Sequence, residues 1–400
     1  MQLAIPMNVT MDHPALGAAQ SSFSVSAYEG GVETVERLAD EWRELCERAT
    51  DDEPFYRPEW MRAHLRAFTR DARVSLIAVR LDGRLHLVLP LVEEKGTVGG
   101  VPVRKLRAPV NAHGGRFDAL RTAAPQGDAA IRVAWQFLKE REGWDLLEFR
   151  NTPQGSTVSE LAAIAAANGF HTMQVPERPS PYVPVSDDPA LLSRMPPNAK
   201  LRSQLRQARR RLAEQGPLIF RRVATADREA LQRFYRLEAS GWKGKEGSAI
   251  LCHEATKNFY DEMADSAARF GYFSLYMLEL NGQLLAGHYS FTHRGRCYSP
   301  KVAYDENFSQ FAPGHLVMQE ILRDCAARGI RDFDITGPND DWKMKWTSET
   351  RALNHHFIFK GVMGSTAHTF RYRLLPAVRR ILRGRRTANV MRGLGRSRPQ

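Results

Sequence analysis

Apolar residues recur along the chain at spacings that predict two successive sets of helices and strands. In the first half, helical spacing occurs at 33–48, 58–68, 128–140 and 159–168. Alternating or continuous apolar runs predict strands at 74–79, 85–92 and 144–149. The turn Asp82-Gly83 joins the first two strands and is a strong hairpin signal. This half therefore predicts helices packed around a short sheet.

The second half repeats this order after prolines at 179–181 and 196–197, which predict a linker. Helical spacing follows at 198–214, 226–240, 253–269 and 314–328. Strands are predicted at 218–223, 272–280, 283–292, 296–303, 331–335 and 354–360. Asn281-Gly282 forms a second hairpin signal, in the same place as Asp82-Gly83 in the first half.

This repetition indicates a weak internal duplication and an α+β (α/β) fold of two tandem domains. We expect each domain to hold a mixed, mostly antiparallel sheet flanked by helices. The predicted domains are residues 26–185 and 186–365. Residues 1–25 are predicted to be a flexible leader, and residues 366–400 a basic tail.

Composition excludes several classes of protein. With 400 residues, of which 43% are hydrophobic and 26% charged, the chain can bury a large core. No run of 18 apolar residues occurs, so no transmembrane helix is predicted. The four cysteines form no CxxC pair, which argues against a zinc ribbon and a disulfide scaffold. We therefore expect a cytoplasmic protein.

The positive charge is concentrated in two segments. Residues 361–400 contribute ten arginines and no acidic residue, which leaves about +2 of the net charge of +12 for the other 360 residues. A second run, from Lys200 to Arg211, contains six basic residues and no carboxylate. Its helix either exposes these residues to solvent or binds phosphates of a cofactor or an RNA.

The segment 371–386 places apolar residues at helical spacing among arginines. This pattern is typical of a helix that lies on a membrane surface or docks on a partner. An unstructured basic tail is the alternative.

The segment from Tyr298 to Leu316 is the first candidate site. A predicted strand leads into a loop, and Pro313-Gly314 opens the helix that follows. The free N–H groups of Gly314, His315 and Leu316 would form an anion site at the positive end of that helix. The alternative is an ordinary connection between a strand and a helix.

Residues 332–346 and 241–244 form two further candidates. In an extended chain, Trp342, Met344 and Trp346 would face one side and Lys343 the other, where a lysine could stabilise an oxyanion or hold a phosphate. The alternative is a half-buried strand with solvated lysines. In Gly241–Gly244, Trp242 and Lys243 either line a substrate cleft or contribute to the core.

The histidines show no HExxH or other metal-binding spacing, so we expect no metal site. His288 lies on a predicted interior strand, where a core histidine is the more common case.

At these positions the chain resembles the CelD-like family, GNAT-type acyltransferases linked to cellulose and exopolysaccharide biosynthesis. The resemblance is specific in the second half and diffuse in the first, and it covers about residues 30–360. It rests on 241–244, 280–288, 304–305, 313–316, 329–334 and 342–346, on the arginine-rich helix, and on 54–56 and 58–60. The related Fem-type aminoacyl transferases carry two tandem GNAT-like domains, which agrees with the duplication.

The resemblance implies two tandem GNAT-like domains and an acyl-CoA thioester lying between splayed strands. The pyrophosphate of the cofactor would then contact Ala312, Pro313, Gly314, His315 and Leu316. Ordinary members have Gln/Arg-x-x-Gly-x-Gly/Ala here, whereas this chain has Pro313 at the first glycine and so lacks one N–H donor. By the same resemblance we assign catalytic roles to Lys343, Asp305 and Asp334. Substrate contacts are assigned to Trp242, Lys243, Trp342 and Trp346.

The implied function is transfer of an acyl group from acetyl-CoA or another acyl-CoA to a hydroxyl or amine of a sugar or polysaccharide precursor, without a metal. Direct attack on the thioester would be assisted by backbone N–H groups. One alternative is a Fem-type transferase that uses aminoacyl-tRNA, held by the basic segments. Another is a non-catalytic accessory of polysaccharide synthesis, peripheral at the inner membrane face through residues 371–386.

Overall fold

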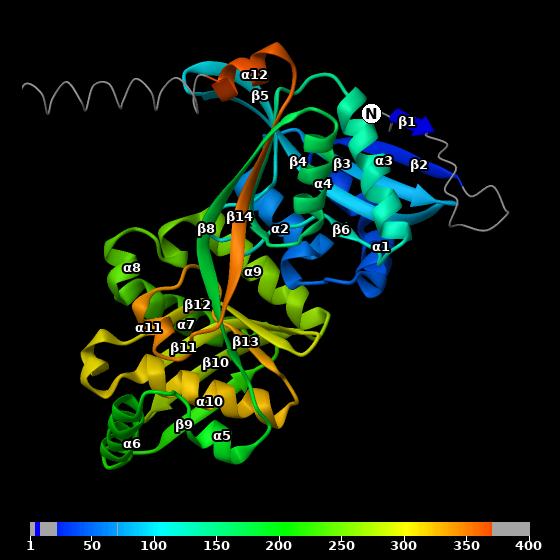
Figure 1. Cartoon of the computed structure of the whole chain (residues 1–400). Helices are drawn as coiled ribbons and strands as arrows, with labels where there is room; N and C mark the ends of the chain where they lie inside the picture. The colour runs from blue at the N-terminus through cyan, green and yellow to red at the C-terminus, as the bar shows by residue number, and fades with distance from the viewer. Residues whose placement is uncertain (1–4, 9–21, 70, 370–400) are drawn as a thin grey trace, which may run out of the picture.

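The computed structural model describes residues 5–8, 22–69 and 71–369 (Figure 1). Its strands follow one hydrogen-bonded path in the order β1-β2-β3-β4-β5-β7-β14-β8-β13-β12-β11-β10-β9, and β6 pairs with β4. Most neighbours are antiparallel, whereas β5–β7 and β12–β13 are parallel. A mixed, mostly antiparallel sheet flanked by helices is therefore confirmed.

The helices and strands predicted for the first half occur in the predicted order, and the described residues contain four further strands that were not predicted. Its strands are β1 (Ile5–Asn8), β2 (Phe23–Gly30), β3 (Val74–Leu81), β4 (Arg84–Val98), β5 (Val101–Arg107), β6 (Leu120–Arg121) and β7 (Leu146–Pro153). Its helices are α1 (Glu33–Arg48), α2 (Pro58–Phe68), α3 (Gln126–Glu140) and α4 (Thr157–Ala167). Helix α1 buries Leu38, Trp42 and Leu45 on one face, as their spacing predicts.

The second half contains a second sheet with its own helices. Its strands are β9 (Leu218–Val223), β10 (Phe273–Leu280), β11 (Gln283–His293), β12 (Arg296–Tyr304) and β13 (Asp332–Asp334). Its helices are α5 (Pro189–Ser193), α6 (Ala199–Ala213), α7 (Arg228–Ser240), α8 (Trp242–Lys245), α9 (Glu254–Arg269), α10 (Pro313–Ala327) and α11 (Asp341–Met344). Both residues of the β10–β11 turn have positive φ (Asn281 50°, Gly282 81°), as a two-residue hairpin turn requires.

Two long strands connect the halves, and Figure 1 shows them crossing from one sheet to the other. Strand β8 (His171–Pro184) pairs with β14 (Thr350–Phe359) over most of its length and with β13 at its end. Strand β14 also pairs with β7. The last strand of the second half therefore completes the sheet of the first half.

The linker predicted from the prolines at 179–181 is wrong, because these residues belong to β8. The strand changes its partner from β14 to β13 in this region, and the register with β14 shifts between Arg351 and Leu353. Proline is tolerated where a strand changes partner or register, since no regular ladder N–H is needed there.

The flexible leader predicted over residues 1–25 contains two strands in its described part, β1 and the start of β2. Alternate residues Phe23, Val25 and Ala27 of β2 are buried. At the other end, α12 (Gly361–Thr369) follows β14. The basic segment 371–386 lies outside the described residues. Within the described part, no helix is both long and apolar enough to span a membrane.

Candidate functional site

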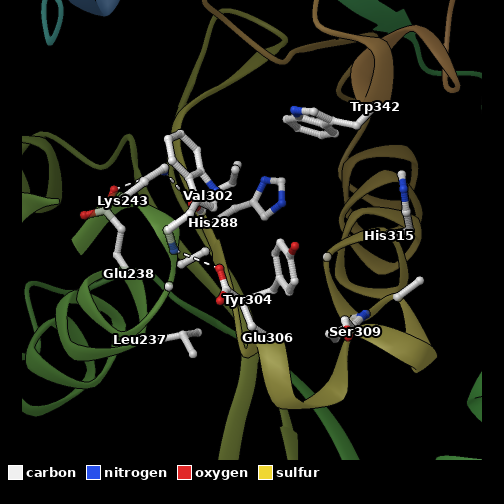
Figure 2. Close-up of a pocket in the computed structure, with 16 residues that line it drawn as sticks. Leu237, Glu238, Lys243, His288, Val302, Tyr304, Glu306, Ser309, His315 and Trp342 are labelled. Atoms are coloured by element: carbon white, nitrogen blue, oxygen red, sulfur yellow. Dashed lines mark hydrogen bonds and ion pairs between the residues drawn. The ribbon is translucent and has the colours of Figure 1, made fainter. Parts of the chain in front are cut away.

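A cavity of about 360 Å³ lies beside strand β12, beyond the residues at which β12 pairs with β13. The two strands pair only at residues 296–298 and 332–334, and the cavity lies beside Val302, Ala303 and Tyr304 of β12, beyond this pairing. The start of α10, the α7–α8 corner and Trp342 of α11 complete its wall (Figure 2). We call this cavity the α10 pocket.

His288 of β11 forms part of the wall and is only 2% exposed. Its Nδ1 lies 2.8 Å from the Ser299 hydroxyl, and its Nε2 has no hydrogen-bond partner among the described residues. Burial lowers the pKa of His288 to about 3, so the ring is neutral at pH 7. The histidine that the sequence indicated as a core residue is therefore buried and also faces the pocket.

Glu238 of α7 is a wall residue that sequence reasoning missed. Its side chain is buried and pairs with Lys243 at 3.1 Å and Lys301 at 3.4 Å, and it accepts the N–H of Ile250 at 2.8 Å. Lys243, predicted to bind substrate, lines the pocket, but its ammonium also donates to the Val302 carbonyl at 2.7 Å. Burial lowers the pKa of Lys301. The spacing of apolar residues on α7 does not indicate that the Glu238 carboxylate is buried.

Aromatic side chains surround the mouth of the pocket. Trp242 is 50% exposed and its backbone N–H donates to Glu306 at 2.8 Å. Trp342 and Tyr304 lie above and below His288 in Figure 2, and Tyr304 is 39% exposed. Three of the four predicted substrate residues, Trp242, Lys243 and Trp342, therefore line the pocket, and the two tryptophans give it flat apolar surfaces.

The first turn of α10 offers fewer donors than the sequence predicted. Ala312 caps the helix in a left-handed conformation (φ 48°), and Pro313 has no N–H. The N–H groups of His315 and Leu316 both donate to the Ala312 carbonyl, at 2.9 and 3.1 Å. Only the N–H of Gly314 has no acceptor among the described residues. Of the five predicted cofactor residues, Leu316 is buried and does not line the pocket.

Trp346 was predicted to contact substrate, but it is fully buried and does not line the pocket. Its indole N–H donates to Nδ1 of His315 at 2.9 Å, and the two rings stack with centroids 5.9 Å apart. The extended conformation predicted for 342–346 is also wrong. Residues Asp341–Met344 form the short helix α11, closed by N–H bonds from Lys343 and Met344 to the Asp340 carbonyl.

Lys343 lies behind the pocket, with an exposure of 7%. Its ammonium donates to the carbonyls of Thr336 and Pro338, each at 2.8 Å, and lies 3.4 Å from Asp340. These three acceptors match the three N–H donors of an ammonium group. The arrangement favours a role in holding the loop between β13 and α11.

The two aspartates predicted to be catalytic also have partners in the protein. Asp305 caps the 3-10 helix η3 (Glu306–Phe311) through the N–H of Asn307 at 3.0 Å and accepts from Gln283 at 2.9 Å. Asp334 has no exposed surface and binds Arg116 at 2.6 Å and Arg351 at 3.0 Å. It therefore joins the two halves of the molecule.

Most of the pocket wall is apolar, as in other small-molecule sites. Few N–H groups are free there for the cofactor pyrophosphate that the resemblance implies. Gly314 supplies one N–H, and the nearby ammonium groups of Lys243 and Lys245 are paired with Glu238 and Glu306. The described residues contain no group of three or more side chains suited to a metal ion.

Residues 199–344 match the family model of the acetyltransferase (GNAT) domain, and the α10 pocket lies within this match. No curated protein shows significant similarity to the chain. Among solved structures, FemX is similar with a TM-score of 0.55 and 14% identity, over 83% of this chain and 97% of FemX.

Two other solved structures share the fold at low identity. A conserved protein of unknown function from Bacteroides thetaiotaomicron gives a TM-score of 0.51 and 11% identity, over 80% of this chain and 97% of its own. The C-terminal DUF2156 domain of a putative lysylphosphatidylglycerol synthetase from Agrobacterium fabrum gives a TM-score of 0.50 and 11% identity. The match covers 84% of this chain and 97% of that domain. The narrower CelD-like assignment stays a prediction. The chain thus has a GNAT-like fold, and its residues 199–344 match the model of the acetyltransferase (GNAT) domain.

Proposed function

We propose that this protein transfers an acyl group from an acyl thioester, such as acetyl-CoA, to a hydroxyl or amine of a sugar or polysaccharide precursor. The observation that carries the proposal is the α10 pocket itself. It lies within the residues that match the GNAT domain model, and the neutral, buried imidazole of His288 lines it.

The reaction requires a proton acceptor and a place for the reacting carbonyl. The acceptor oxygen or nitrogen attacks the carbonyl carbon, a new ester or amide bond forms, and the bond to sulfur breaks. The acceptor loses one proton, and the leaving thiolate gains one. The Nε2 atom of His288 receives the proton in the tautomer in which Nδ1–H donates to the Ser299 hydroxyl, 2.8 Å away.

The rim supports an acceptor with a flat apolar face. Trp242 and Trp342 stand at the mouth of the pocket on different elements, α8 and α11. A sugar ring has apolar C–H faces and polar edges, so it can stack on indole while its hydroxyl reaches inward. This chemistry agrees with a glycan acceptor.

Calorimetric titration with acetyl-CoA and longer acyl-CoAs at two salt concentrations tests the proposal. We expect micromolar binding that Gly314→Glu abolishes. A Cβ added at Gly314 would lie 3.6 Å from the ring of Tyr304, so the new carboxylate would enter the pocket and exclude the donor. Ala166→Glu, on the exposed face of α4, is the control that adds the same charge elsewhere. Unchanged affinity in folded Gly314→Glu would remove the α10 pocket as the donor site.

A Fem-type reaction with aminoacyl-tRNA is the second candidate. It is favoured by the single free N–H at the start of α10 and by α6, which packs beside α10 and presents Lys200, Arg206 and Arg211 as exposed residues. In that case tRNA would bind with strong salt dependence and acyl-CoA would not bind. Absence of both kinds of binding would instead favour the non-catalytic accessory.

A further inference from the structure

The contact between Trp346 and His315 fixes which nitrogen of His315 carries its proton. An indole N–H can only donate a hydrogen bond. The Nδ1 atom of His315, 2.9 Å away, must therefore be the acceptor. A neutral imidazole that accepts at Nδ1 carries its proton at Nε2. The buried tryptophan thus selects the tautomer of a residue that lines the pocket.

The surroundings of His315 keep the ring neutral. Burial and the nearby Lys345 ammonium lower the pKa of His315 to about 4. The ring also lies in the first turn of α10, where the helix dipole disfavours a positive charge. His315 therefore remains an uncharged N–H donor throughout the neutral pH range.

Gly314 and His315 are the two residues of this turn that offer a free N–H to the pocket. The backbone N–H of Gly314 has no acceptor among the described residues, and the Nε2–H of His315 is the ring donor left after the bond to Trp346. Figure 2 shows His288 on β11 and His315 on α10, and both residues line the pocket. A carbonyl bound between the two histidines would have donors on one side and a proton acceptor on the other.

We infer that His315 is a catalytic residue whose Nε2–H, together with the Gly314 N–H, binds the oxygen of the acyl carbonyl, and that Trp346 is its positioning residue. The inference rests on the proposed function. When the nucleophile adds to the carbonyl carbon, the oxygen becomes negative and both hydrogen bonds strengthen. The bond to sulfur then breaks, the carbonyl re-forms, and neither His315 nor Trp346 gains or loses a proton. Here the imidazole side chain replaces donors that Pro313 and the capped helix turn do not supply.

Nitrogen NMR of the full chain, labelled uniformly with 15N, tests the tautomer directly. We expect a neutral His315 ring protonated at Nε2 at pH 7, assigned by its loss in His315→Gln. The probe is S-acetyl-N-acetylcysteamine, a minimal thioester without a nucleotide. Its addition should shift the Nε2 signal of His315 and the Gly314 amide signal together. Trp346→Phe should remove the tautomer preference while the protein stays folded.

Turnover measurements separate a donor from a merely structural contact. His315→Leu should lower kcat about 10²–10³-fold with little change in KM, as expected for an oxyanion donor. His315→Gln, which keeps a side-chain N–H, should recover part of this loss. Trp135→Phe is the control for Trp346→Phe, because Trp135 is a buried tryptophan of the first half whose indole N–H has no partner among the described residues.

Three results would overturn the inference. The first is a His315 ring protonated at Nδ1. The second is an unchanged His315 signal while the indole signals of Trp242 and Trp342 respond to the thioester, which would leave the acyl pocket intact. The third is equal turnover of His315→Leu and the unmodified protein. If no pocket signal responds to the thioester, the proposed function fails and the inference fails with it.

Discussion

Two cavities of this molecule differ in how their polar groups are satisfied. A second cavity, of about 480 Å³, lies between β5, β7 and the crossing strands, and it is lined by charged side chains. There Glu148 pairs with Lys105 at 3.3 Å and Arg150 at 2.6 Å, and His355 contacts Glu177 at 2.8 Å. In the smaller α10 pocket, His288 and His315 each keep one ring nitrogen without a protein partner among the described residues.

This difference distinguishes groups that hold the fold from groups left open to a ligand. Neither open ring nitrogen is among the fully buried side-chain atoms without a partner in the described residues, which include His64 Nδ1 and Trp135 Nε1. An open ring nitrogen becomes useful when it faces a cavity that a reacting group can enter. The comparison predicts that paired charges affect stability and that the open imidazoles affect turnover.

The largest expected effect is on stability. Asp334→Asn removes the carboxylate that holds Arg116 and Arg351, and leaves Arg116 buried with Glu53 as its remaining ion-pair partner. We expect the free energy of unfolding, measured by urea titration, to fall by about 3–5 kcal/mol. Asp187→Asn, which breaks the exposed pair with Arg331, is the control and should change stability little. Equal small effects of the two substitutions would contradict this assignment.

His288→Asn should reduce turnover strongly and stability only slightly. The amide of asparagine can still bond to Ser299, but it does not reach the pocket as Nε2 does. We expect kcat to fall about 10²–10⁴-fold, the usual contribution of a positioned proton acceptor. Urea denaturation should show a much smaller change in stability than that of Asp334→Asn. Full activity in this variant would leave proton removal to water or to another group.

Stability should also decrease in acid because of buried neutral histidines. Burial lowers the pKa of His288 and of His64 to about 3, whereas the unfolded value is 6.5. Below pH 6.5 the unfolded chain therefore binds protons that the folded protein excludes, and stability falls as the pH drops toward 3. At pH 5 we expect a loss of about 2 kcal/mol for each of these histidines.

His288→Asn serves as the test of this pH dependence, measured as the free energy of unfolding between pH 7 and pH 5. The variant should lose less stability over this range than the unmodified protein does. An identical slope for both proteins would show that His288 is not the group that is protonated on unfolding.

The smallest expected effect is that of Lys343→Met, which distinguishes a role of Lys343 in holding the loop from a role in catalysis. If it holds the loop, Lys343→Met should lower the free energy of unfolding by about 1–3 kcal/mol, because the buried Thr336 carbonyl and the partly buried Pro338 carbonyl lose their donor. Turnover should then fall only modestly. If it is catalytic, as the family resemblance implies, turnover should fall far more than stability. The exposed Lys345, substituted in the same way, is the control.

Much of the fold could be predicted from the sequence, because its elements have strong local signals. The helical stripes of α1 and α6 and the turns at Asp82-Gly83 and Asn281-Gly282 are each defined within a few residues. The path of β8 could not be predicted, since its prolines indicate a linker when read alone. Only the pairing with β14, about 170 residues later in sequence, makes this segment a strand.

The candidate site also has features that the sequence predicts and features that depend on tertiary structure. The sequence alone determined the proline and glycine that open α10 and the tryptophans beside it, because these are local features of a strand, loop and helix. Tertiary structure decided which side chains are free. Lys343 and Asp334 find their partners through loop closure and through contacts between the halves, whereas His288 and His315 each have one nitrogen engaged and one open. Whether a side chain is free to bind a ligand depends on the neighbours that folding brings to it. The order of residues along the chain does not show which neighbours these are.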